Sequence, residues 1–462
     1  MRYISMVAMG AVLASGAWAS GFRLNEQSLN ATALSSAYIA GAMGADSSYY
    51  NPANMGFDDN NELEVNATMI FIPGFDFTTY SKDAGIKISG IQSPDKPDRR
   101  GNLVNGYANS TTYFVPKMFF KTKALQVNDT LKSSFGISLT TPSGLTMNWG
   151  GEGGEFMDNV GIAMVEVNPV MALTFNDRFS IGGGMRFIYA SGDFNNSLYV
   201  PFDYTPSALP IPTSGTTYVK QTSETSAVGV GYNLAATLKI TEKTTLAITY
   251  RSKVHFDMKG KLNANSALPM TMSGMDSINM TADLNLSTDL PDTINVGLAH
   301  RFEKLLAEFA YEHTFWSKAD IFEFQYSNNK FYNPNTGAEV TDPSILGGVT
   351  AADYSAVAMG RGWKNSNAFR LGFTYFSSPK LTLMGSLALD LTPVPQGKDR
   401  FGIPDANAYM LGLGARYAIL DNRADVGIAY SLSLKDNRNS FIQSKDGLGQ
   451  LHLLTIGAKY RF

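Results

Sequence analysis

The side chains that could carry out chemistry are few, and their spacing is not that of a catalytic or metal site. No HExxH pair, GxSxG elbow or GxGxxG fingerprint occurs in the chain. A glycine-rich run at 150–154 contains Glu152, which favours a loop over a phosphate-binding turn. We expect no enzyme, no catalytic residue, no metal site and no cofactor; a barrel lipase, which needs only Ser, His and a polar partner, stays open as an alternative. The histidines, which could act as acids, bases or metal ligands, are scattered at His255, His300, His313 and His452.

The first residues have the three parts of a secretory signal. Arg2 supplies the basic start, an apolar run follows over 4–14, and small residues at Ala17 and Ala19 precede a cleavage site. The apolar run is too short to span a bilayer. We expect 1–19 to be a signal peptide and the mature chain to begin at Ser20.

Composition narrows the class of protein. A net charge of −3, without a basic run interleaved with aromatic residues, argues against nucleic-acid binding. The hydrophobic content of 44% and mean hydropathy of −0.10 are ordinary for a soluble protein. A membrane barrel is equally compatible, because each of its strands needs only every second residue to be apolar. Composition alone therefore leaves a soluble all-β secreted protein and a membrane barrel as alternatives.

Alternating apolar and polar residues favour the barrel. Runs over 380–392, 406–420 and 423–435 have one apolar face bounded by aromatic residues and one small or polar face. The last run does the same and ends the chain on Phe462, which resembles the C-terminal signature of outer-membrane barrels. Its apolar residues are Leu454, Ile456, Ala458, Tyr460 and Phe462.

About fourteen strand-length runs are predicted, an even number as in single-chain bacterial barrels. Alternate connections are very short, as at Asn176-Asp177 and Asp421-Asn422, and these are expected to be periplasmic turns. We predict an all-β fold, a transmembrane antiparallel β-barrel of about fourteen strands over 61–462. The runs lie near 62–79, 111–124, 131–142, 160–176, 178–199, 222–240, 243–261, 277–302, 305–323, 363–377, 380–392, 406–420, 423–435 and 448–462.

Residues 20–60 have a different character. They are rich in Ala, Ser and Asn, and their apolar positions fall near a helical spacing. We predict a small, mostly helical N-terminal hatch that plugs the lumen, since a compact piece at the front of a barrel has few other places to go. Candidate gating residues are those where glycine frees the backbone or proline restricts its neighbour, although they can equally be ordinary turn residues. They are Gly41, Gly44, Asn51, Pro52 and Ala53.

Two long connections, Ser197–Gly215 and Ala264–Met280, are apolar for exposed loops. The unbranched thioether chain of methionine suits an adaptable apolar surface. Such loops either pack on each other over the mouth of the barrel or capture an apolar ligand. The candidate ligand-binding residues in them are Leu209, Leu268, Met270 and Met272.

Several motifs occur in the order found in the FadL family, the outer-membrane channels for long-chain fatty acids and hydrocarbons (OMPP1/FadL/TodX-like). The chain resembles this family over nearly its whole mature length. The motifs are Gly21-Phe22-Arg23-Leu24-Asn25-Glu26, Asn51-Pro52-Ala53, Gly144-Leu145-Thr146, Tyr250-Arg251-Ser252, Lys259-Gly260, Leu290-Pro291-Asp292, Trp316, Trp363-Lys364, Thr392-Pro393-Val394-Pro395 and Ile403-Pro404-Asp405.

The resemblance implies a bacterial outer-membrane location and a gated route for a hydrophobic ligand. The ligand would be captured by apolar extracellular loops, pass to a site near the N-terminus, and leave sideways into membrane lipid at a kinked third strand. Phe22 would be the aromatic residue of the tight site, and Lys364 a cation near the ligand carboxylate. A second family cation is replaced near Ser191, which leaves neutral hydrocarbons open as substrates. The expected partners are a long-chain fatty acid or other hydrophobic small molecule and outer-membrane lipid, and the barrel would work as a monomer.

Three classes of function remain from the sequence: a transporter of hydrophobic compounds, a general porin, and a barrel lipase or adhesin. The predicted plug and apolar loops favour the first. Uptake of a fatty acid is the preferred reading, and uptake of aromatic or aliphatic hydrocarbons is its alternative.

Overall fold

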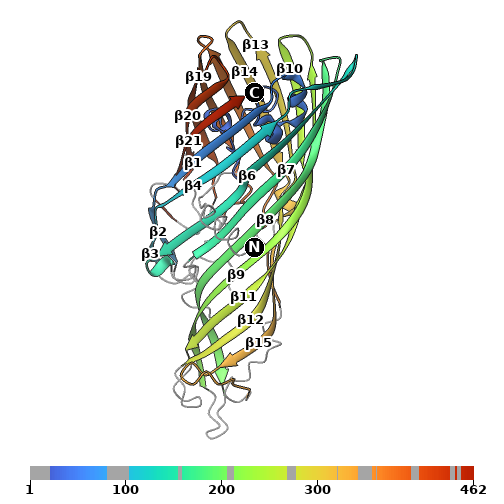
Figure 1. Ribbon diagram of the computed structural model, residues 1–462. Helices are drawn as coiled ribbons and strands as arrows, with labels where there is room; N and C mark the ends of the chain where they lie inside the picture. The colour runs from blue at the N-terminus through green and yellow to red at the C-terminus, as the bar shows by residue number, and fades with distance from the viewer. Residues whose placement is uncertain are drawn as a thin grey trace.

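The computed structural model describes most of the chain as a tall β-barrel with short helices inside it (Figure 1). The described residues are 21–80, 103–154, 159–204, 213–267, 277–319, 321–341, 356–360, 362–396, 405–437, 443–444 and 449–462. Within these ranges, no helix has the length and apolar content needed to cross a bilayer.

The barrel contains fourteen antiparallel strands, as the sequence predicts, and β1 closes it by pairing with β21. Several barrel strands are formed from two consecutive pieces, such as β10 and β11, which both pair with β9. The single-piece strands are β1 (Glu62–Ile72), β4 (Thr111–Lys121), β6 (Leu131–Gly150), β7 (Asn159–Phe175), β8 (Phe179–Tyr204), β9 (Thr213–Lys239), β18 (Leu381–Asp390), β19 (Ala408–Ile419), β20 (Ala424–Lys435) and β21 (Gln450–Arg461). The two-piece strands are β10 (Thr244–Arg251) with β11 (Val254–Ala267), β12 (Ser277–Leu290) with β13 (Thr293–Arg301), β14 (Leu305–Thr314) with β15 (Ile321–Tyr332), and β16 (Ala356–Gly360) with β17 (Ser366–Phe376).

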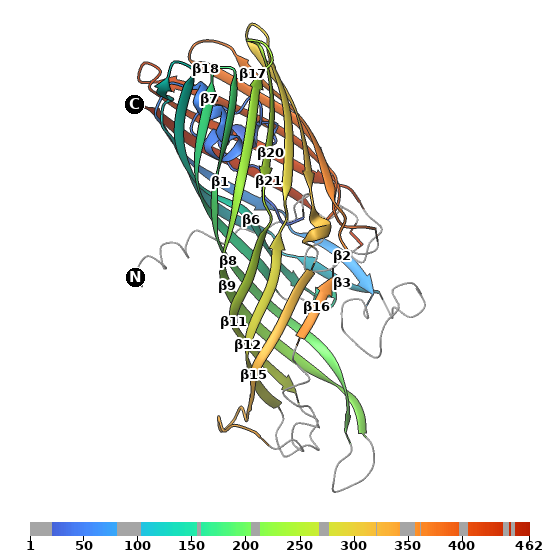
Figure 2. The same cartoon turned by 90° about the vertical axis from the view of Figure 1, so that its right-hand side faces the viewer.

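The two ends of the barrel differ. One end has tight turns, in which Asn176, Asp177, Asp421 and Asn422 adopt positive φ as two-residue hairpins require; we call it the short-turn end. At the other, the long-loop end, strands β8, β9, β11, β12 and β15 continue far beyond the rest of the barrel (Figure 2). A hairpin of β2 (Phe75–Tyr80) and β3 (Leu103–Ala108) adjoins the last residues of β6, with which β3 pairs, while β5 (Leu125–Asn128) pairs with the first residues of β6 at the short-turn end.

Several strands are longer than predicted. The third predicted strand ended at 142, but β6 continues to Gly150 and includes the Gly144-Leu145-Thr146 motif. The predicted loops 197–215 and 264–280 were partly wrong. Strands β8 and β9 extend into the first, and β11 and β12 extend into the second. These strands are longer than the rest because neighbouring strands continue to pair with them.

The apolar face of the wall changes sides along the strands. In β10, Leu246 and Ile248 face outward and are exposed, whereas Arg251 faces the lumen and is buried. In β11, Phe256 and Met258 are buried in the lumen, and the alternating positions, which carry His, Asp, Lys and Asn, are exposed. Near the short-turn end the barrel is therefore apolar outside and polar inside, which suits lipid. Toward the long-loop end it is polar outside and apolar inside.

The hatch occupies the polar half of the lumen, where its helices appear in blue (Figure 1). It contains α2 (Leu29–Ala33), α3 (Ser47–Tyr50) and the 3₁₀ helix η1 (Pro52–Phe57). Ser28 starts α2, because its hydroxyl accepts a hydrogen bond from the Ala31 N–H. The apolar side chains of the hatch pack in a cluster with Phe119, Met384 and Ala429 of the wall. Two further 3₁₀ turns, η3 (Glu152–Gly154) and η4 (Trp316–Lys318), lie in the connections of the wall.

Candidate functional site

Three aromatic side chains meet where the hatch touches the apolar half of the lumen. Phe22 is fully buried, and its ring centroid lies 4.8 Å from that of Trp316 in an edge-to-face arrangement. Trp316 is 4.9 Å from Trp363 in the same geometry, and Phe22 is 6.3 Å from Trp363. Edge-to-face pairs are favoured by the quadrupoles of the rings. We call these three residues the aromatic cage. It joins the start of the hatch to two connections between strand pieces, one at η4 and one just before β17.

Gly21 allows this close approach. Its φ is +66°, and a Cβ added to it would lie 2.7 Å from Trp316 and 2.8 Å from Trp363. Only glycine fits both the conformation and the space. The Gly21 N–H donates to Asp405 at 3.3 Å, and the same carboxylate is 2.9 Å from the ammonium of Lys435. Burial raises the pKa of Asp405 to about 7, although Lys435 opposes the shift.

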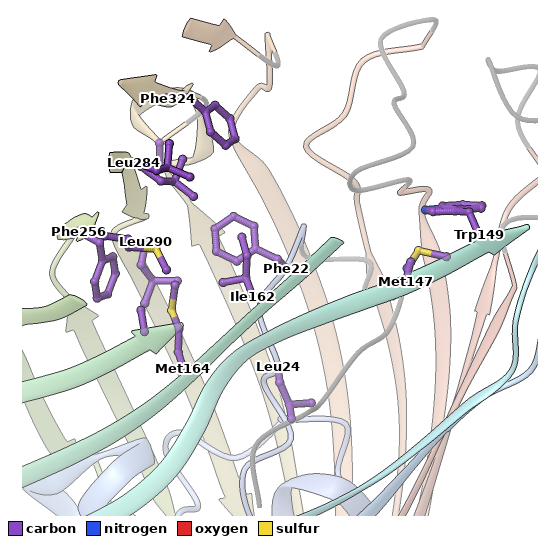
Figure 3. Close-up of a cluster of buried hydrophobic side chains, with 14 of the residues drawn as sticks. Phe22, Leu24, Met147, Trp149, Ile162, Met164, Phe256, Leu284, Leu290 and Phe324 are labelled. Atoms are coloured by element: carbon purple, nitrogen blue, oxygen red, sulfur yellow. The ribbon is translucent and has the colours of Figure 1, made fainter. Parts of the chain in front are cut away.

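The cage is one edge of a larger apolar surface, which we call the apolar lumen. Its side chains come from the hatch and from strands on several sides of the barrel, and they gather around Phe22 (Figure 3). Burying each methylene of a ligand here gains about 0.8 kcal/mol relative to water. Residues that define it are Leu24, Ile162, Met164, Ile188, Phe256, Met258, Leu284, Leu286, Leu290 and Phe324.

The wall is interrupted next to this surface. The ladder between β4 and β6 runs only from Lys121–Gly136 to Met118–Leu139, although β4 continues to Thr111 and β6 to Gly150. Pairing of β6 with β7 shifts register between Thr140 and Ser143. Two prolines, Pro116 and Pro142, lie just beyond the last pair and have no N–H to donate. The third strand therefore has an irregular register at the place where its pairing with β4 ends.

The first residues of the hatch take the place of the missing partner of β6. Leu24 N–H donates to the Pro142 carbonyl at 3.0 Å, and Arg23 forms an antiparallel bridge with Ser143. The side chain of Gln27 imitates a strand neighbour, donating to Thr141 O at 2.7 Å and accepting from its N–H at 2.9 Å. Residues 22–27 thus seal the break from inside the lumen.

The rest of the hatch is fixed to the wall. The carboxylate of Glu308 in β14 accepts hydrogen bonds from the N–H groups of Ile39, Ala40 and Gly41 at 2.6, 2.7 and 2.8 Å. A Cβ on Gly41 would lie 2.7 Å from the same carboxylate. Gly41 is therefore needed for close approach, which is a structural reason for glycine independent of gating.

The other predicted gating residues are also held. Gly44 has a φ of +88°, and a Cβ there would lie 2.6 Å from Glu62. The Asn51 side chain donates to Ile39 O at 2.9 Å and to Thr237 Oγ1 of β9 at 2.9 Å, and accepts from Ala53 N–H. Pro52 begins η1 in the position where its missing N–H has no cost. These residues anchor the hatch, whereas 22–27 contact the break.

Charged groups gather between the hatch and the short-turn end. Arg416 contacts Glu64 at 2.5 Å, Asp425 at 2.7 Å and the hatch residue Asn30 at 2.7 Å. Burial, and secondarily the charge of Glu64, raise the pKa of Asp46 to about 7. A cavity of about 480 Å³ lies here between hatch and wall, and its lining mixes ions with apolar groups. It is at the opposite end of the hatch from Phe22.

The predicted ligand-binding residues lie in different surroundings. Phe22 is buried in the apolar cluster of the candidate site, and its role in ligand binding stays a prediction. Lys364 follows Trp363 in the chain, but its side chain is exposed, and its N–H donates to Pro393 O at 2.9 Å. Ser191 lies in β8, and Leu209, Leu268, Met270 and Met272 lie outside the described residues. Within the described part of the chain, no group of three or more His, Asp or Glu side chains could hold a metal ion.

Other residues at the site were missed. Gln27, Pro142 and Lys117 contact or border the break, and only Pro142 carries a signal in the sequence, because a proline inside a strand pattern marks a disturbed ladder. The sequence places Trp316 and Trp363 in motifs but assigns neither of them a role at the site. Their meeting with Phe22 depends on how the barrel closes.

A family model described as outer membrane protein transport protein (OMPP1/FadL/TodX) matches residues 10–462. A long-chain fatty acid transport protein of Salmonella typhi is 25% identical, covering 95% of this chain and 93% of its own length. The protein of the same name from Shigella flexneri is 23% identical, with coverage of 95% and 94%.

Solved structures share the fold. A Pseudomonas aeruginosa FadL homologue has a TM-score of 0.69 at 18% identity, covering 96% of this chain and 100% of that one. The toluene transporter TodX of P. putida has a TM-score of 0.65 at 15% identity, with coverage of 95% and 99%. Relatives named for fatty acids and for an aromatic hydrocarbon are therefore both present.

Proposed function

The chain belongs to the OMPP1/FadL/TodX family of outer-membrane transport proteins, and from this premise we propose that it carries long-chain fatty acids into the outer membrane by a lateral route. Members of this family transport hydrophobic compounds across the outer membrane. The protein is accordingly a bacterial outer-membrane β-barrel. The short-turn end is the periplasmic end, and the long-loop end is extracellular.

The route begins in the apolar lumen. Above the bilayer, strands such as β11 and β12 keep polar residues toward water and present Phe256, Met258 and Leu284 inward. An acyl chain entering here leaves water before it reaches the membrane. It then arrives at the aromatic cage, where Phe22 belongs to the segment that seals the break.

The single observation that carries the proposal is the position of residues 22–27 at the end of the β4–β6 ladder. Because Leu24 and Gln27 bond to β6 through only a few hydrogen bonds, they can leave while the hatch stays anchored. Their departure would join the apolar lumen to bilayer lipid, so that the ligand never re-enters water. One chain supplies lumen, cage and seal, and we infer that a monomer is sufficient and that no enzymatic step is involved.

A second candidate substrate is an aromatic hydrocarbon. The cage favours it, since three adjoining aromatic rings suit an aromatic ligand, and the Lys364 side chain is exposed rather than directed at Phe22.

Uptake into cells that lack other transporters of this class tests the proposal. Labelled oleate, toluene and a small sugar are compared in cells with and without the protein. We expect oleate uptake to depend on the protein and sugar entry to be unaffected. Toluene uptake without oleate uptake would establish the second candidate, and sugar entry without either apolar ligand would establish a general porin.

A further inference from the structure

Lys117 is a buried cation that makes no ion pair with a carboxylate among the described residues. Its side chain, in β4, points into the lumen and is 1% exposed. The ammonium donates to the Glu26 carbonyl at 2.8 Å and to Thr68 Oγ1 at 3.0 Å. Among the described residues, no carboxylate lies within 4.0 Å of it. The other buried cations of the described wall each have such a partner; these are Lys121, Arg186, Arg251, Arg370, Arg416, Lys435 and Lys459.

Burying a charge without a counter-charge is costly, even when neutral groups accept its hydrogen bonds. The carboxyl group of Glu26 belongs to the same residue as the carbonyl that Lys117 contacts, but it accepts a hydrogen bond from Ser36 Oγ at 3.4 Å. Burial also raises the pKa of Glu26, which disfavours its charged form. Within the described part of the wall, Lys117 thus lacks the direct ion pair that the other buried cations have.

The depth of Lys117 matches the head group of an amphipathic ligand. On the inward face of β4, Val115 belongs to the apolar lumen and Phe119 to the hatch cluster, with Lys117 between them. The neighbouring strand β1 changes in the same way, from Ile70 in the apolar lumen to Thr68. An acyl chain lying in the apolar lumen would bring its carboxylate to this boundary.

Lys117 also lies at the break. The last pair between β4 and β6 is Met118–Leu139, so Lys117 is the first residue of β4 beyond the ladder. Its contact to Glu26 O belongs to the segment that seals the break. Displacing that segment removes one acceptor and frees an N–H that a ligand oxygen can take.

We propose that Lys117 binds the carboxylate of the ligand as it passes from the apolar lumen through the break between β4 and β6. The inference rests on the proposed lateral route and names its substrate class, a long-chain carboxylate rather than a neutral hydrocarbon. Before the ligand arrives, the same ammonium holds Glu26 O, so ligand and seal compete for one cation.

Charge at position 117 can be varied while hydrogen-bond donors are kept. Lys117→Gln removes the charge, and Lys117→Arg retains it. Uptake of oleate and of 1-octadecene, a neutral chain of the same length, is measured for both variants. We expect Lys117→Gln to lower oleate uptake tenfold or more and to leave octadecene uptake within twofold of the wild type, with Lys117→Arg close to wild type for both.

Lys121→Gln is the matched control, because Lys121 lies on the same face of β4 but is paired with Asp58 at 3.2 Å. Folding of each variant is checked by its heat-modified mobility on gels. Equal loss of both ligands in Lys117→Gln, or no loss of oleate, would overturn the role of Lys117 and leave the lateral route intact. Absence of oleate uptake by the wild type would instead refute the proposed function, and the role of Lys117 with it.

Discussion

Arg23, near the start of the hatch, pairs with Ser143 of β6 as residues of adjacent antiparallel strands pair. The Ser143 hydroxyl also donates to Phe22 O at 2.6 Å. The residue that completes the wall therefore adjoins the residue that enters the aromatic cage. A ligand that displaces Phe22 would disturb the seal directly.

A disulfide across this pair should lock the break. The chain has no cysteine, so Arg23→Cys with Ser143→Cys would give a single possible bridge. Paired residues in antiparallel strands have Cα separations of about 4.5 to 5.5 Å, within the range of disulfides. We expect oleate uptake to be lost on oxidation and restored by a reductant. The two single-cysteine variants are controls, and uptake by the oxidised double variant would show that residues 22–27 do not gate the route.

Removing the ring of Phe22 should weaken ligand binding. Phe22→Ala deletes one side of the cage and opens space beside Trp316, and loss of a buried aromatic contact of about 1.5 kcal/mol corresponds to roughly tenfold in affinity. Tryptophan fluorescence titrated with oleate measures it, because Trp316 and Trp363 adjoin the site. Trp149→Phe should leave the signal change intact, since Trp149 packs on Phe75 and Phe77 instead. An unchanged affinity in Phe22→Ala would place the ligand elsewhere.

Removing the Glu308 carboxylate should loosen the hatch. Glu308→Ala leaves three buried N–H groups, from Ile39 to Gly41, without their acceptor, and each such loss costs about 1–3 kcal/mol. Hydrogen exchange of residues 39–41 should accelerate while the strands remain protected. Glu303→Ala, on an exposed turn, is the control. Unaltered exchange would mean that other contacts suffice to hold this segment.

Stability should fall as pH rises through the range where Asp46 ionises. Burial raises the pKa of Asp46 from 3.8 to about 7, so the folded protein holds this proton more tightly than the unfolded chain. The stabilisation that Asp46 contributes is therefore fully present below about pH 4 and is lost progressively as the pH rises through about 7. We expect a lower unfolding temperature in detergent at pH 8 than at pH 5.

The variant Asp46→Asn should show a smaller difference between the two pH values, because the amide does not titrate. Part of the difference should remain, since burial also raises the pKa of Asp405. Asp421→Asn, on an exposed turn, should behave as the wild type does. A pH dependence identical in Asp46→Asn and wild type would contradict the assignment.

Local patterns were enough to predict the barrel. Alternation such as that of Leu454 and Ile456 repeats every two residues, and the hairpin turns at Asn176 and Asp421 depend only on neighbouring residues. The hatch could also be predicted, because its composition departs from that of the strands.

The sequence by itself determined a barrel of about fourteen strands, an N-terminal hatch, and Phe22 as a candidate through motif order. It did not show on which side the apolar residues of β11 lie, since a period of two is the same for a lumen-facing and a lipid-facing residue. Only the tertiary structure decided that Phe256 faces inward, that β4 and β6 part beyond Leu139, and that Lys117 is buried with no described carboxylate in ion-pair distance. The physical reason is that burial, ion pairing and ladder continuity depend on segments far apart in the chain, which meet only when the barrel closes.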